Sequence, residues 1–175
     1  MVNTLAKRLA IGIKQVVPEA PQSVEVLSYA LSFILNALYI IGASLLISLF
    51  TGKVQEVIIV LIGYALLRQV SGGIHLKSGT LCIIISTAGA TALSFVSFNH
   101  NVLLLVTAIS LLLALVYAPS RIDKQTRIPS KYYPLLKLIS LVIISSSFFI
   151  GSAVLASAFL LQSLTLIRKK EVQTK

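Results

Sequence analysis

Long apolar runs separated by short polar breaks make up most of this chain. The runs are residues 27–50, 57–67, 80–98, 102–118 and 135–167, and the helix of the short second run must extend over about 54–70 to span a bilayer. A helix needs about 20 apolar residues to cross the hydrocarbon core of a bilayer. Only 11% of the 175 residues are charged, against about a quarter in soluble domains. Because so few charged residues cannot cover a water-exposed surface, lipid must face much of the protein surface. The sequence therefore predicts an all-α membrane helix bundle.

The last run, residues 135–167, is too long for a single comfortable span. As one helix it would measure about 50 Å, against a hydrocarbon core of about 30 Å. It is either one tilted helix or a tight hairpin that turns near Gly151 and Ser152. The hairpin places every Lys and Arg except Lys53 on the side of the N-terminus, in agreement with the positive-inside rule. We therefore predict about six spans, with both termini in the cytoplasm.

The first 26 residues carry scattered basic residues and an apolar stripe. Leu5, Leu9 and Ile13 recur every four residues and so share one helical face. This pattern predicts a short helix on the membrane surface that stops before Pro18 and Pro21. A frayed basic tail is an equally good interpretation.

The net charge of +10 narrows the class of partners. The basic residues lie between the apolar runs, where they set orientation and bind anionic lipid headgroups. We therefore expect anionic membrane lipids, and not nucleic acid, as partners. The absence of a Pro/Gly-rich linker and of an internal repeat predicts one domain, residues 1–175.

The break between the second and third spans holds the residues with reactive side chains. From Arg68 to Cys82 it reads RQVSGGIHLKSGTLC, and it contains the only cysteine and one of two histidines. An imidazole that removes the thiol proton turns a cysteine into a nucleophile. On a continuous helix His75 and Cys82 would lie about 10 Å apart. The backbone must therefore leave the helix, as Gly72, Gly73 and Gly79 permit.

A capped third span would favour reactivity at Cys82. Ser78 or Thr80 can cap this helix, which places Cys82 in the first turn. Unpaired N–H groups at a helix N-terminus favour a thiolate and can hold an oxyanion. The alternative is that Cys82 is a small buried hydrophobe.

The pattern Arg68-x4-Gly73-x-His75-x-Lys77-Ser78-x3-Cys82, with Tyr117-Ala118-Pro119 further on, resembles the accessory gene regulator B (AgrB) family. These are membrane peptidases of Gram-positive quorum sensing. They cut the C-terminal tail from a small signal-peptide precursor, AgrD, and promote thiolactone or lactone closure.

The resemblance implies roles for individual residues. Cys82 would be the nucleophile and His75 the general base, while Arg68 and Gly73 would support the substrate or the oxyanion. No third residue that orients His75 can be named. The resemblance also implies a homodimer in the plasma membrane of a Gram-positive bacterium. Neither a metal nor a cofactor is expected.

Three non-catalytic interpretations remain open, for Arg68, for Asn36 and for the chain as a whole. Arg68 can simply extend from a helix end to the membrane interface, and Asn36, deep in the first span, can link two helices. The chain as a whole can be a small transporter or membrane-organising protein without covalent chemistry. Such a protein would be expected to carry acidic residues inside the membrane, and none lies inside the apolar runs.

Overall fold

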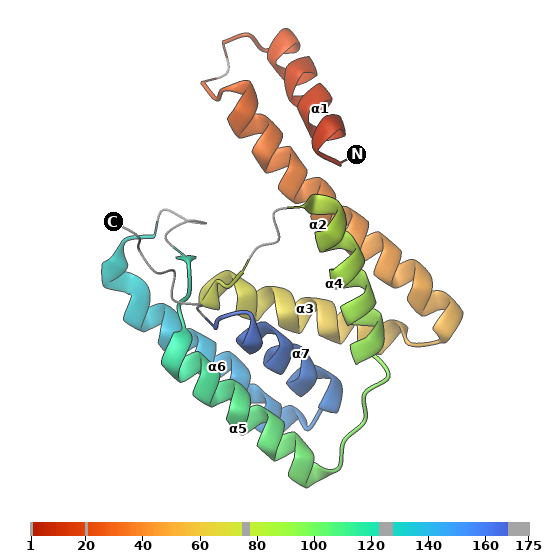
Figure 1. Cartoon of the computed structure of the whole chain (residues 1–175), viewed down its shortest axis with the longest axis vertical. Coiled ribbons are helices and arrows are strands. Elements are labelled where there is room, and N and C mark those ends of the chain that lie inside the picture. Colours follow the sequence, from red (N-terminus) through yellow and green to blue (C-terminus); the bar gives the residue numbers. More distant parts are fainter. Residues whose placement is uncertain (1, 20, 75–77, 123–127, 168–175) are drawn as a thin grey trace, which may run out of the picture. The chain divides into compact units, whose positions relative to one another are not determined.

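The computed structural model describes residues 2–19, 21–74, 78–122 and 128–167, and these residues are almost entirely helical. The α-helices and a short 3-10 turn, Ser130–Tyr132, follow one another along the chain (Figure 1). The helices are α1 Val2–Val16, α2 Val24–Thr51, α3 Val54–Ser71, α4 Gly79–Leu93, α5 His100–Tyr117, α6 Tyr133–Ile150 and α7 Ala153–Leu164. The predicted all-α class is confirmed.

Four of the described helical segments are long and apolar enough to cross a membrane. They are Val24–Thr51, Val54–Ser71, His100–Tyr117 and Ser130–Ile150. Their surfaces expose large apolar side chains: Phe50 is 86% exposed and Phe149 is 91% exposed. In water such exposure would be costly, so these helices belong in lipid. The chain is a membrane protein.

The other two apolar helices are shorter than a span. α4 has 15 residues and α7 has 12, which correspond to about 22 Å and 18 Å of rise. The apolar run predicted to reach residue 98 ends as a helix at Leu93, where a turn begins with bonds from the N–H groups of Phe95 and Val96. Ser94–Phe98 contains serine, valine and phenylalanine, which favour a helix less than alanine or leucine does. Hydropathy alone therefore overestimated the length of this helix.

The hairpin interpretation of the last apolar run is right. α6 ends at Gly151, which adopts a left-handed conformation (φ +67°) and donates its N–H to the carbonyl of Ser147. α7 then begins with Ser152 as its N-cap, whose Oγ accepts the N–H of Leu155 at 3.3 Å. Glycine is the residue best suited to such a helix end.

The chain divides into two compact units. Unit 1 comprises residues 1–52 and 75–91, and unit 2 comprises residues 53–74 and 92–175. The single domain expected from the sequence stays a prediction.

In unit 1 the N-terminal helix α1 packs along α2. Val2, Ala6 and Ala10 form its buried face. The stripe of Leu5, Leu9 and Ile13 stays about 40% exposed. The predicted helix is therefore present and ends before Pro18. Its small residues face α2, while its larger apolar residues remain available to a membrane surface.

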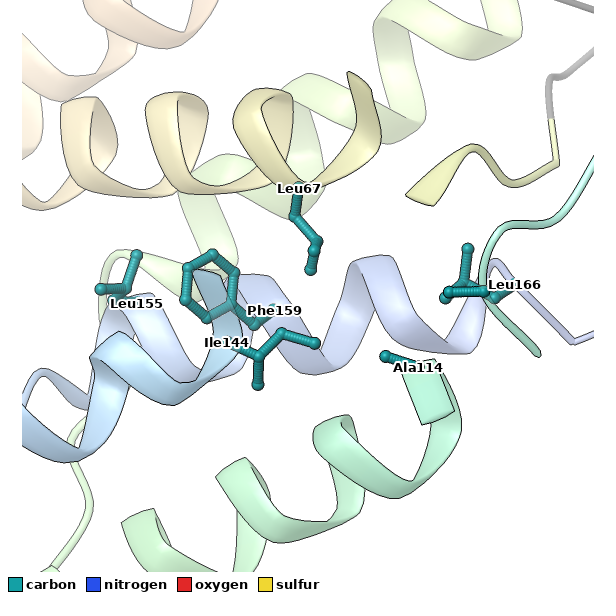
Figure 2. Packing of buried hydrophobic residues seen from close by; sticks show 7 residues of the cluster. Leu67, Ala114, Ile144, Leu155, Phe159 and Leu166 are labelled. Carbon is teal, nitrogen blue, oxygen red and sulfur yellow. The ribbon is translucent and has the colours of Figure 1, made fainter. Parts of the chain in front are cut away.

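In unit 2 the short helix α7 contacts α3, α5 and α6 (Figure 1). Eight of its twelve residues are buried, so α7 is a core element that lipid hardly touches. Figure 2 shows Phe159 and Leu155 of α7 packed with side chains from the neighbouring helices. The labelled members of this cluster are Leu67, Ala114, Ile144, Leu155, Phe159 and Leu166.

Candidate functional site

Cys82 lies in the first turn of α4, as the sequence predicts. Ser78 caps this helix: its Oγ accepts the N–H of Leu81 at 3.4 Å, and its carbonyl accepts the N–H of Cys82 at 3.0 Å. Of the two possible caps, Ser78 is therefore the one used. Cys82 is half-buried, and its Sγ lies 4.0 Å from the Oγ of Ser86. A thiol here lies close to the positive end of the helix dipole and is partly shielded from solvent.

Asn36 of α2 meets the start of α4 at Gly79. A Cβ on Gly79 would lie 3.1 Å from both Oδ1 and Nδ2 of Asn36, so a side chain there would press on the amide. The Oδ1 of Asn36 is buried and has no hydrogen-bond partner among the described residues. Asn36 therefore lies against the start of α4, but its Oδ1 forms no hydrogen bond with a described residue, so a link between the two helices through this amide stays a prediction.

Two hollows open in unit 1 at the start of α4. The larger has a volume of about 670 Å³ and runs between α1 and α2 to Gly79. The smaller, about 230 Å³, is bordered by Asn3 and by Ser78, Gly79 and Thr80. Charged, polar and aromatic side chains mix in the larger hollow, whose lining is Asn3, Lys7, Val24, Glu25, Ser28, Tyr29, Ser32, Phe33, Asn36 and Gly79. Such a mixture can take up the backbone and side chains of a peptide.

The predicted partner of Cys82 is His75. His75 lies outside the described residues, with its two following neighbours. Contact between the imidazole and the thiol therefore stays a prediction.

The chain leaves α3 at two glycines, as expected. Gly72 has φ +73° and Gly73 has φ +123°, both in the region that favours glycine. The N–H of Gly73 donates to the carbonyl of Ser120 at 2.9 Å, and the N–H of Ser120 donates to the carbonyl of Ser71 at 2.8 Å. These two bonds form a short parallel bridge. A Cβ on Gly72 would collide with the carbonyl oxygen of Ser120.

Residues at the end of α7 also form hydrogen bonds with residues 71–74. Nε2 of Gln162 donates to the Gly72 carbonyl at 2.7 Å and to the Ser71 Oγ at 3.1 Å. The N–H of Ile74 donates to the carbonyl of Thr165 at 3.1 Å. A Cβ on Gly73 would lie 2.5 Å from Thr165 Oγ1, so only glycine fits there. Gly72, Gly73 and Ile74 together are named the segment 72–74.

Arg68 also reaches this segment. Its Nη2 donates to the carbonyl of Ile74 at 2.7 Å, and its guanidinium lies 5.9 Å from the centre of the Tyr64 ring. In the structure Arg68 therefore binds backbone of its own chain. A role for Arg68 or Gly73 in substrate or oxyanion support stays a prediction.

Sequence reasoning missed Ser120, Gln162 and Thr165. Ser120 follows the segment Tyr117-Ala118-Pro119 that the family pattern had already singled out. For Gln162 a signal existed: it is an amide inside a 33-residue apolar run, and an amide in an apolar surrounding needs partners.

Comparison with known families and proteins agrees with these features. Residues 1–167 match the family Accessory gene regulator B. An AgrB-like protein of Halalkalibacterium halodurans is 32% identical over 120 residues, which are 68% of this chain and 61% of that protein. The chain thus spans about three-fifths of the length of that relative. No solved structure matches the chain. Because the family match covers nearly the whole chain, this protein belongs to the accessory gene regulator B family.

Proposed function

We propose that this protein is a membrane cysteine endopeptidase that cuts and cyclises a small signal-peptide precursor. Membership of the accessory gene regulator B family supports a role in accessory gene regulator signalling. The observation that carries the peptidase proposal is the placement of Cys82, half-buried in the first turn of a capped helix. A peptide-sized hollow of about 670 Å³ reaches the same helix end.

The proposed reaction begins with an acyl transfer to Cys82. His75 removes the thiol proton, and the thiolate attacks the carbonyl carbon of the scissile peptide bond. N–H groups at the start of α4, which have no acceptor within their helix, stabilise the tetrahedral oxyanion. The imidazolium then protonates the departing amine, so the tail leaves and a thioester to Cys82 remains.

Ring closure releases the product. A cysteine thiol or serine hydroxyl of the bound precursor attacks the thioester carbonyl and gives its proton to His75. The bond to Cys82 breaks, and the Cys82 sulfur takes the proton back from the imidazolium. A thiolactone or lactone forms, and the enzyme returns to its starting state. Water must be kept from the thioester until the ring closes, and the partial burial of Cys82 supports such exclusion.

The direct test uses the purified protein in proteoliposomes that contain anionic lipid. The substrate is a synthetic AgrD-like precursor peptide, and mass spectrometry follows both the released tail and the ring. We expect the tail to appear together with a core peptide that has lost one water relative to the linear cut product. A precursor left intact, under conditions where the protein stays folded, would argue against the proposal.

His75→Ala is expected to lower the cleavage rate by about a hundredfold or more at neutral pH, because the thiol loses its base. Raising the pH restores part of the rate, since hydroxide then removes the thiol proton. Initial rates between pH 7 and pH 10 check this. His100→Ala is the matched control, because His100 is the other histidine of the chain and lies outside the motif from Arg68 to Cys82. Equal losses in both variants would remove His75 from the base role.

We further propose that the protein lies in the plasma membrane of a Gram-positive bacterium, as a homodimer with both termini in the cytoplasm. Single cysteines at Lys53 and Lys131, on a Cys82→Ser background, test the orientation. A membrane-impermeant maleimide is expected to label Lys53→Cys on intact cells, and Lys131→Cys only after permeabilisation. The reverse pattern would overturn the orientation.

A further inference from the structure

We infer that Gln162 is a positioning residue whose buried amide fixes the backbone leading into His75. The inference rests on the proposed function, because it assigns His75 the role of base. Its basis is a set of hydrogen bonds inside unit 2, which connect α7 to the segment 72–74.

The amide of Gln162 is fully buried, and both its nitrogen and its oxygen form hydrogen bonds. Its Nε2 has two acceptors, the Gly72 carbonyl and the Ser71 Oγ. Its Oε1 accepts from Thr165 Oγ1 at 3.2 Å. Burying an amide is unfavourable unless such bonds form. A leucine would fill similar space within this apolar helix, but it would leave the Gly72 carbonyl without this donor.

Each residue of the segment 72–74 is held by a different bond. Gln162 binds the Gly72 carbonyl, Ser120 accepts from the N–H of Gly73, and Thr165 accepts from the N–H of Ile74. Two of these three bonds come from the last turn of α7 and the residue after it. Thr165 is itself oriented by Gln162, because its Oγ1 donates to the Gln162 carbonyl at 2.7 Å.

His75 is the next residue in the chain after this segment. The direction in which the backbone leaves Ile74 therefore limits where the imidazole can reach. Catalytic groups must be held to within about 0.5 Å of their working geometry, and a misplacement of about 1 Å can cost about a hundredfold in rate. Loss of the Gln162 bonds loosens the backbone and so places the base less well, while no residue that lines the larger hollow is changed.

The test is Gln162→Leu, with Ser157→Ala as the matched control on the same helix. Ser157 is also buried, but among the described residues its Oγ bonds only to the Ala153 carbonyl of its own helix. We expect Gln162→Leu to lower kcat for precursor cleavage by about tenfold to a hundredfold, with KM within twofold of wild type. Ser157→Ala is expected to leave both constants within twofold. A loss confined to KM, or no loss of kcat, would overturn the inference.

A second pair of variants covers the case in which Gln162→Leu fails to fold. Thr165→Val removes the hydroxyl that meets Gln162, and Thr165→Ser keeps it. We expect Thr165→Val to lower kcat and Thr165→Ser to restore it to within about twofold of wild type. Equal kcat values for the two variants would speak against the inference.

Hydrogen exchange separates this inference from the proposed function, because it needs no substrate. In Gln162→Leu the amides of Gly73 and Ile74 are expected to exchange at least about tenfold faster than in wild type. Unchanged exchange overturns the inference even if the enzyme is active. If exchange accelerates but the Cys82→Ala variant cuts the precursor as fast as wild type does, the proposed function fails instead.

Discussion

Replacing Cys82 with alanine is expected to lower the rate of precursor cleavage by at least about a thousandfold, because no nucleophile remains to form the thioester. The helix should tolerate the change, since alanine is the best helix former and Cys82 is only half-buried. Initial rates in proteoliposomes, measured by mass spectrometry of the released tail, give the comparison.

Two measurements make this result specific. Ser146→Ala is the control, because the Oγ of Ser146 on α6 bonds, within the part of the chain that the structure describes, only to the Ile143 carbonyl of its own helix. It is expected to keep the wild-type rate within about twofold. In wild type, a precursor lacking its ring-closing cysteine or serine is expected to accumulate as a covalent adduct on Cys82, which hydroxylamine releases. Retained cleavage in Cys82→Ala would exclude the thioester route.

Replacing Gly72 with alanine is expected to destabilise the protein by roughly 3 kcal/mol. Two effects combine. The backbone at Gly72 has φ +73° and ψ −138°, a region closed to other residues. A Cβ would also meet the carbonyl oxygen of Ser120, a backbone atom that cannot swing aside. Thermal unfolding in detergent micelles measures the loss.

Gly42→Ala is the matched control for this prediction. Gly42 lies within the helix α2, and a Cβ there has nothing within 4 Å. We expect no loss of stability, and up to about 1 kcal/mol of gain from helix propensity. Equal melting temperatures for Gly72→Ala and wild type would mean that the bridge to Ser120 does not constrain the segment 72–74.

Much of the fold follows from local sequence signals. Hydropathy located the apolar helices, and the glycine and serine at 151 and 152 marked the hairpin between α6 and α7, because a left-handed cap and an N-cap are short-range features. The lengths of α4 and α7 were not predictable in this way. Hydropathy measures whether side chains suit lipid, and the buried core around α7 selects for the same residues.

In the candidate site, too, the features set by neighbouring residues could be predicted, and those set by distant residues could not. Capping by Ser78 and the place of Cys82 in the first turn depend on four or five neighbouring residues. Both features could therefore be predicted from the sequence alone. The glycine pair was expected to loosen the backbone, yet the structure shows it held by Ser120 and Gln162. Those partners lie far along the chain, Gln162 being 90 residues from Gly72. A single sequence carries no record of such pairings.

The dependence of the segment 72–74 on Gln162 and Thr165 has a consequence for biosynthesis. A ribosome has to add about ninety further residues after Gly72 before these hydrogen-bond donors and acceptors exist. Nascent chains inserted only as far as α5 would already contain both the imidazole and the thiol, but would lack the restraint from α7. Enzyme activity would then arise late in synthesis, after most of the polypeptide has entered the bilayer.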